Sequence, residues 1–267
     1  AYKAAELVRL WVKAGHTVDV VMTESATRFI APATFQALSG RPVFTDLWDT
    51  RPSNGMAHIA LTRQADIFVI APATADVLAR LAQGRCDDLI TTLAAARTCP
   101  LAVAPAMNKQ MWDNPPNQRN VAQLRADGIT VLGPGSGEQA CGEIGEGRML
   151  EPEALAELTE GLFVAKTLHG KCVVLTAGPT YEPIDPVRGI TNISSGQMGY
   201  ALARACRDAG AEVVLVTGPT ALPLPIGVTC VPVQTACQMQ AAVMENLAAC
   251  EVFIAVAAVA DYRIQAT

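Results

Sequence analysis

Apolar and polar residues follow the same pattern in two parts of the chain. A stretch with helical spacing of its apolar positions ends at Gly15, and residues 17–22 then form a nearly continuous apolar run. The pattern returns as a helical stretch from Tyr200 to Gly210, followed by an apolar run over 212–217. A helix, a glycine stop and an apolar, β-branched strand are typical of parallel α/β sheets with both faces buried. The pattern therefore predicts two α/β units in tandem.

Two further stretches correspond, and they outline the domains. Residues 65–76 and 250–261 each contain an acid, a predicted buried strand and a loop of small residues that ends in Ala-Asp. The seam falls near 162–171, where a helix ends and a new strand begins. We predict an α/β protein of two doubly wound parallel-sheet domains, over residues 1–165 and 166–267.

The two predicted domains differ at their beginnings. The second opens with a strand at 171–176 before its helix, whereas the first opens with its helix. Strand-first order is the norm in such sheets, so we expect the first strand of the first domain to be missing from this sequence. The sequence starts without Met and stops directly after an apolar run, and we expect a chain truncated at both ends.

Composition narrows the classes of function. The net charge is −5 and no run of Lys and Arg occurs, which disfavours nucleic-acid binding. No uncharged apolar window of about eighteen residues is present, so no membrane span is predicted. The 8 cysteines are scattered without C-x-x-C spacing, which indicates reduced thiols rather than a disulfide framework or a metal site. We expect a cytoplasmic protein that acts on small molecules.

Ligands of doubly wound sheets bind at the carboxyl ends of the strands, so the loops there are the candidate sites. One predicted strand ends at Pro105 and presents Met107 and Asn108, whose amide can bind a ligand or cap the following turn. His58 lies ahead of another strand, as a proton carrier or as a structural hydrogen-bonding residue. Thr74 lies among small residues that would let a phosphate approach the backbone or would form an ordinary tight turn.

A glycine-rich loop over 133–147 contains Cys141. A structural cysteine is usually a small buried residue within an apolar run. Cys141 lies instead among glycines and charged residues. The position alone leaves open whether the thiol takes part in chemistry or is a structural thiol in a loop.

Several long motifs resemble known enzymes. The segments "HIALTRQADIFVIAPATAD", "APAMNKQMW" and "ACGEIGEGRM" resemble the flavin-dependent phosphopantothenoylcysteine decarboxylases. The segments "TAGPTYEPIDPVRGITNISSGQMGYALA" and "AAVADYR" are similar to phosphopantothenate–cysteine ligase. Their fusion resembles the bifunctional flavoproteins of bacterial coenzyme A biosynthesis. The resemblance implies a flavodoxin-like domain followed by an incomplete Rossmann-like ligase domain.

The resemblance implies a first reaction, in which 4′-phosphopantothenoylcysteine is decarboxylated to 4′-phosphopantetheine with FMN as the electron sink. Cys141 would be the final proton donor, on a flap that bends at Gly142, Gly145 and Gly147. His58 would assist substrate deprotonation, and Asn108 would bind the substrate carboxylate. The residues implied to hold FMN are Thr23, Ser25, Pro72, Ala73, Thr74, Ala75, Ala106 and Met107.

The second implied reaction activates 4′-phosphopantothenate with CTP, accompanied by Mg²⁺, to an acyl-cytidylate that the amine of cysteine attacks. Asn192 matches the residue that acts on the acyl-cytidylate. The matching nucleotide contacts are Ser194, Ser195, Gly196, Ala255, Val256, Ala257 and Asp261. A helix-capping serine would explain Ser194 equally well. The catalytic lysine of the family would lie beyond Thr267, so we do not expect this chain alone to ligate.

The resemblance also implies a homo-oligomer, with decarboxylase trimers joined into a dodecamer and a dimer formed through the ligase part. Two alternatives lie within the same superfamily: a peptidyl-cysteine decarboxylase and a flavin-binding regulatory subunit. The ligase-like domain disfavours the first alternative. The presence of both Asn108 and Cys141, without an acidic tail, disfavours the second.

Overall fold

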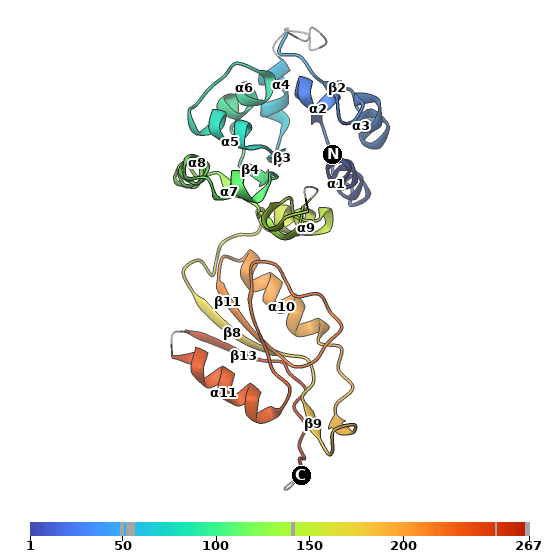
Figure 1. Cartoon of the computed structure of the whole chain (residues 1–267), viewed down its shortest axis with the longest axis vertical. Helices are drawn as coiled ribbons and strands as arrows, with labels where there is room; N and C mark the ends of the chain where they lie inside the picture. Colours follow the sequence, from blue (N-terminus) through green and yellow to red (C-terminus); the bar gives the residue numbers. More distant parts are fainter. Residues whose placement is uncertain (49–50, 52–56, 140–141, 249, 265–267) are drawn as a thin grey trace. The chain divides into compact units, whose positions relative to one another are not determined.

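The chain divides into two compact units, unit 1 over Ala1–Thr159 and unit 2 over Glu160–Thr267 (Figure 1). The computed structural model describes residues 1–48, 51, 57–139, 142–248 and 250–264. None of the helices in these ranges is long and apolar enough to cross a membrane.

Unit 1 alternates short strands with helices. Its elements are α1 (Tyr2–Lys13), β1 (Val20–Val21), α2 (Glu24–Thr27), α3 (Pro32–Ser39), β2 (Val43–Phe44), α4 (Ala57–Gln64), β3 (Phe68–Ala73), α5 (Ala75–Ala82), α6 (Leu89–Ala96), β4 (Leu101–Pro105), α7 (Lys109–Asp113), α8 (Pro115–Ala126), β5 (Thr130–Val131), β6 (Gly135–Glu138), β7 (Ile144–Arg148) and α9 (Pro152–Gly161). Strands β3, β4 and β5 form one parallel sheet, and β1 and β2 form a separate parallel pair.

The core of unit 1 surrounds β4, in which every residue is buried. Val103 of this strand packs with Leu78 of α5 and Leu124 of α8. A strand buried on both faces needs a continuous apolar run, and this explains the unbroken "LAVAP".

Two expectations for unit 1 were wrong in detail. The strand expected over 17–22 is only Val20–Val21, because its partner β2 is equally short and the preceding Asp19 is engaged with Arg41 at the surface. The glycine-rich segment expected as a loop contains an antiparallel hairpin of β6 and β7. Glycine is depleted in strands, so the sequence pattern did not reveal the hairpin.

Unit 2 contains one parallel sheet with the strand order β12-β11-β8-β13, and a small antiparallel pair, β9 and β10. Its elements are β8 (Cys172–Ala177), β9 (Tyr181–Pro183), β10 (Gly189–Thr191), α10 (Gln197–Asp208), β11 (Glu212–Thr217), β12 (Thr229–Pro232), α11 (Ala236–Leu247) and β13 (Val252–Ala255). The first strand, β8, lies between β11 and β13, so the strand order reverses there, as at the ligand site of a Rossmann sheet.

Alternating residues of β8 show that the sheet is covered on both faces. Val173 and Leu175 pack with Tyr200 of α10, whereas Val174 packs with Met239 of α11. Successive strand side chains point to opposite faces, so α10 and α11 lie on opposite sides of the sheet (Figure 1). The doubly wound α/β architecture predicted from the sequence is confirmed.

One cysteine expectation was wrong. Cys172 and Cys250 form a disulfide, with their Cα atoms 4.6 Å apart. The two residues are 78 positions apart in sequence, and only the pairing of β8 with β13 brings them together. The described free cysteines are Cys86, Cys99, Cys206, Cys230 and Cys237.

Candidate functional site

The ends of β3 and β4 bring two of the predicted loops together. The backbone N–H of Ala106 donates to the carbonyl of Ala73 at 3.0 Å. In the strand register, Ala73 pairs with Pro105. The predicted cofactor segment Pro72–Ala75 and the segment Ala106–Asn108 therefore meet at one edge of the sheet.

Two threonines of the predicted site cap helices. Thr74 accepts a hydrogen bond from the N–H of Val77 at 3.3 Å, at the start of α5. Thr23 accepts one from the N–H of Ala26 at 3.1 Å, at the start of α2. A hydroxyl that accepts in a cap still has its own O–H to donate to a ligand. Thr23 and Ser25 lie beside the separate β1–β2 pair, and their described hydrogen bonds stay within the α2 segment.

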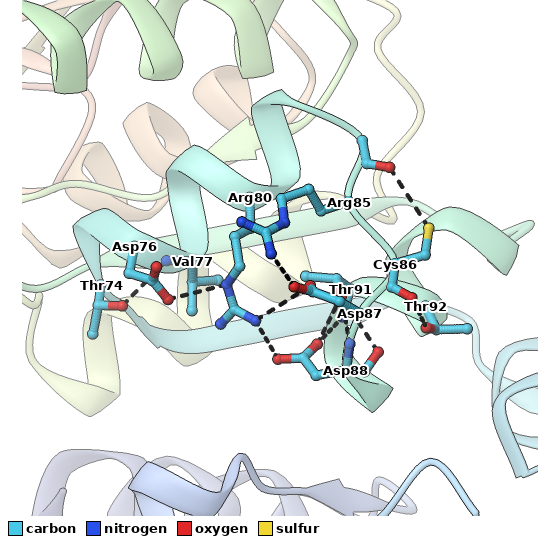
Figure 2. Close-up of polar contacts among 11 residues, drawn as sticks. Thr74, Asp76, Val77, Arg80, Arg85, Cys86, Asp87, Asp88, Thr91 and Thr92 are labelled. Carbon is cyan, nitrogen blue, oxygen red and sulfur yellow. Dashed lines mark hydrogen bonds and ion pairs between the residues drawn. The ribbon is translucent and has the colours of Figure 1, made fainter.

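An ion-pair network fixes the helix that Thr74 caps. Arg80 Nε lies 3.0 Å from a carboxylate oxygen of Asp76, and Arg80 Nη1 lies 2.5 Å from Asp88 Oδ2 (Figure 2). Asp88 also caps α6 by accepting from the N–H of Thr91 at 2.8 Å. Burial acts to raise the pKa of Asp88, but the hydrogen bonds from Thr91 and Arg80 outweigh it and hold the pKa below its ordinary value. The network ties the first turn of α5 to the start of α6.

Asn108 caps α7, and its side chain also reaches a distant segment. Its Oδ1 accepts from the N–H of Met111 at 3.0 Å. Its Nδ2 donates to Gln110 Oε1 at 2.6 Å and to Glu143 Oε2 at 3.2 Å. The capping and the ligand-binding interpretations are therefore compatible, because the cap uses the carbonyl oxygen and leaves the NH₂ group to donate to other acceptors.

The β6–β7 hairpin docks onto the Asn108 loop. The N–H of Met107 donates to the carbonyl of Gly147 at 2.9 Å, and the N–H of Lys109 donates to Gln139 Oε1 at 2.9 Å. A side chain at Gly147, where φ is +127°, would place its Cβ 2.4 Å from the carbonyl oxygen of Met107. Only glycine fits so close to that loop. Cys141 itself lies outside the described residues.

Sequence reasoning missed the residues that make this docking. Glu143 Oε1 accepts from Gln110 Nε2 at 2.8 Å, and Glu146 Oε2 accepts from Trp112 Nε1 at 3.0 Å. These residues belong to motifs that the sequence singled out, but their partners are more than thirty positions away. No local pattern signals such a pairing.

His58 lies in the first turn of α4. Its Nδ1 is buried and has no hydrogen-bond partner among the described residues. A buried polar atom without a partner is unusual in a folded protein and marks a place where a ligand can supply the missing bond. No described contact joins His58 to Asn108, so the structure does not bring these two candidates together directly.

In unit 2, the loop that follows β13 is hydrogen-bonded both by Asn192 and by Thr176 of β8. Asn192 Nδ2 donates to the carbonyls of Ala258 at 3.2 Å and Val259 at 2.9 Å. The hydroxyl of Thr176 accepts from the N–H groups of Val256 and Ala257, both at 3.2 Å. The structure therefore brings Asn192 together with the loop that follows β13. Asp261, further along this loop, is exposed.

The residues ahead of α10 line a shallow pocket of about 580 Å³. Gly196 has φ +76°, and the hydroxyls of Ser194 and Ser195 accept from the N–H groups two residues ahead, both at 3.4 Å. The predicted nucleotide contacts include the two serines but not the other lining residues, which are Pro219, Thr220, Ala221 and Leu222. The described residues hold no group of three or more His, Cys, Asp or Glu that could bind a metal ion.

Comparisons with known proteins also divide the chain into two parts. The flavoprotein family model matches residues 1–164, and the DNA/pantothenate metabolism flavoprotein C-terminal domain matches residues 168–267. The coenzyme A biosynthesis bifunctional protein CoaBC of Vibrio cholerae is 52% identical over 265 residues, which cover 99% of this chain and 66% of that protein. The chain thus spans about two thirds of the length of the curated relatives it matches.

Two solved structures resemble unit 1. A cysteine-to-serine mutant of PPC decarboxylase complexed with pantothenoylaminoethenethiol is 33% identical, with a TM-score of 0.54, over 59% of this chain and 88% of that one. The FMN-binding protein AtHal3 is also 33% identical, with a TM-score of 0.53, over 60% of this chain and 89% of that one. Together with the two family matches, these likenesses confirm the resemblance inferred from the motifs. The chain belongs to the CoaBC family of bifunctional coenzyme A biosynthesis flavoproteins.

Proposed function

We propose that unit 1 catalyses the FMN-dependent decarboxylation of 4′-phosphopantothenoylcysteine to 4′-phosphopantetheine. The observation that carries the proposal is the docking of the β6–β7 hairpin onto the loop of Asn108, through Asn108 Nδ2 and Glu143. In this docking, Glu143 and Gly147 of the "ACGEIGEGRM" motif contact the loop whose amide would bind a substrate carboxylate, which supports the proposal. The likeness to PPC decarboxylase supports the same activity.

The residues at the ends of β3 and β4 fit a flavin. Ala73, Ala75 and Ala106 have small side chains, and the Thr74 hydroxyl can donate to a polar ligand. Backbone N–H groups at the start of α5 suit a phosphate. When bound, FMN supplies the electron sink that an unactivated cysteine carboxylate lacks. The proposed FMN residues are those that the motifs implied, from Thr23 to Met107.

The side chains of this chain would then bind substrate and move protons. The NH₂ group of Asn108 would donate to the substrate carboxylate. The Nδ1 of His58, which has no hydrogen-bond partner among the described residues, would accept a proton from substrate. Cys141 would donate the last proton, because the basicity of its thiolate is close to that of the enethiolate that it protonates.

We propose that unit 2 contributes the first part of a phosphopantothenate–cysteine ligase in the longer protein. CTP, accompanied by Mg²⁺, would bind at Ser194–Gly196 and at the loop that Asn192 holds. The position of this loop beside β8, where the strand order reverses, supports the proposal. 4′-Phosphopantothenate and cysteine would be the substrates. We also propose a cytoplasmic homo-oligomer, built from decarboxylase trimers and ligase dimers.

The visible spectrum of the purified protein tests the cofactor. We expect a yellow protein whose released flavin has the mass of FMN. A folded, colourless protein that does not take up added FMN would contradict the decarboxylase proposal.

A further inference from the structure

The side chain of Glu143 occupies two amide donors in unit 1. Its Oε2 accepts from Asn108 Nδ2 at 3.2 Å, and its Oε1 accepts from Gln110 Nε2 at 2.8 Å. Both oxygens of one carboxylate are thus bound by side-chain amides of the loop that follows β4. This is the arrangement that a carboxylate-bearing ligand would adopt at the same amides.

The direction of the Asn108 amide is fixed by the fold. Its Oδ1 accepts from the N–H of Met111 at 3.0 Å in the cap of α7, so rotation of the carboxamide would break the cap. The NH₂ group must therefore face Gln110 and Glu143. A ligand carboxylate that binds Asn108 has to approach from the side where Glu143 already lies.

The position of Glu143 is fixed as well. Its own carbonyl accepts from the N–H of Gln139 at 2.8 Å, within the hairpin. A Cβ added at Gly145 would lie 2.5 Å from Lys109 Cδ, so the hairpin backbone lies close to this loop. The contact between Glu143 and Asn108 is therefore part of a docked hairpin and not a chance surface contact.

We propose that Glu143 is an internal carboxylate that the carboxylate of the substrate replaces on Asn108 and Gln110, which makes Glu143 a specificity-determining residue. The inference rests on the proposed function, in which Asn108 binds the substrate carboxylate. Two carboxylates cannot share these donors without like-charge repulsion, so binding proceeds by exchange. Decarboxylation removes the carboxylate of the substrate, after which Glu143 returns to Asn108. The product, which has no carboxylate, no longer has a partner in Asn108 and Gln110 and is released more easily.

Replacing Glu143 by Gln removes the charge and keeps the shape. Hydrogen bonds to a charged acceptor are about twice as strong as those to a neutral one, so Asn108 and Gln110 hold the substituted side chain less tightly than Glu143. We therefore expect the Kd of a carboxylate ligand to fall by about 5- to 10-fold. A ligand without the carboxylate does not compete for the amides, and its Kd should change less than about 2-fold.

Two unreactive ligands make this comparison. The serine and ethanolamine amides of 4′-phosphopantothenate lack the thiol and differ only in the carboxylate. Calorimetry on the flavin-loaded protein would give both Kd values for the wild type, Glu143→Gln and Glu143→Ala. Glu138→Gln is the matched control, because Glu138 is an exposed carboxylate on the same hairpin.

Tighter binding of the serine amide alone, by both Glu143 variants and not by the control, is the expected result. Equal changes for both ligands, or weaker binding of the serine amide by Glu143→Gln, would overturn the exchange. Failure of the flavin-loaded wild type to bind either ligand would overturn the proposed function itself, and the exchange with it. Thermal unfolding of each variant checks that the fold is retained.

Discussion

At Asn108, one carboxamide serves the fold and faces the candidate site at the same time. Its carbonyl caps α7 and its NH₂ group points to the docked hairpin. From the sequence, capping and ligand binding were rival interpretations, because a residue type after a strand does not reveal which atom is used. The structure supplies the missing information, since the two roles use opposite ends of one amide.

If Cys141 is the proposed proton donor, a single substitution there should separate the last chemical step from the earlier ones. A serine hydroxyl is a far weaker acid than a thiol but nearly the same size. We expect Cys141→Ser to decarboxylate the substrate and then stall, with a species lighter than 4′-phosphopantetheine by two hydrogens. Anaerobic mixing with 4′-phosphopantothenoylcysteine and mass spectrometry would detect it. Normal production of 4′-phosphopantetheine by this variant would show that Cys141 is not the donor.

At the scale of elements, strands with a long apolar run were predicted well, whereas the glycine-rich strands were not predicted. The strand over 212–217 has the predicted bounds in β11, because its apolar run is long and buried. The β6–β7 hairpin was expected as a loop, because its contacts with the Asn108 loop come from residues more than thirty positions away and are not visible in any local pattern. Its docking through Gly147 depends on packing against Met107, which only the fold brings close.

The docking of the hairpin predicts the effect of a single methyl group. Gly147→Ala would clash with the Met107 carbonyl and would also strain a positive φ. Gly128→Ala is the control, because it has a positive φ of +77° and open space around it. Strain alone costs about 1 kcal/mol, and we expect Gly147→Ala to cost more and to reduce decarboxylation at least about 10-fold. Denaturant unfolding would measure the loss of stability, and turnover would measure the loss of decarboxylation. Equal effects of the two variants would contradict the docked arrangement.

The Arg80 network predicts how acid affects the link between α5 and α6. The pKa of Asp88 is held below its ordinary value of 3.8, so the charged form is stabilised in the folded state. This stabilisation is complete above the ordinary pKa and is lost as the pH falls below it, through the lowered pKa. Asp88→Asn keeps the cap but loses the ion pair, and should cost about 1 kcal/mol near neutral pH.

Thermal unfolding as a function of pH checks this prediction. The difference in Tm between wild type and Asp88→Asn should be constant from neutral pH down to about pH 5 and should shrink below about pH 4. Arg85, exposed nearby, offers Arg85→Gln as a control without such a profile. A difference that grows as the pH falls would contradict the role given to Asp88.

At the scale of the whole molecule, the repeated helix–glycine–strand pattern was enough to predict two α/β units. In unit 2, β8 and β11 were predicted at or near their bounds because each is a distinct apolar run. The contacts that build the candidate sites could not be predicted, because Asn192 meets Ala258 and Asn108 meets Glu143 only after the strands have paired. The disulfide of Cys172 and Cys250 is hidden from the sequence for the same reason.

The measurement that tests the central claim most directly is the fate of the substrate carboxyl carbon. The flavin-loaded protein would be incubated with 4′-phosphopantothenoylcysteine labelled at the cysteine carboxyl group. We predict release of labelled CO₂ in equal amount to unlabelled 4′-phosphopantetheine, and loss of both when Asn108 is replaced by Asp, which repels the carboxylate. Retention of the label in the substrate, by a protein that holds FMN and binds that substrate, would contradict the account.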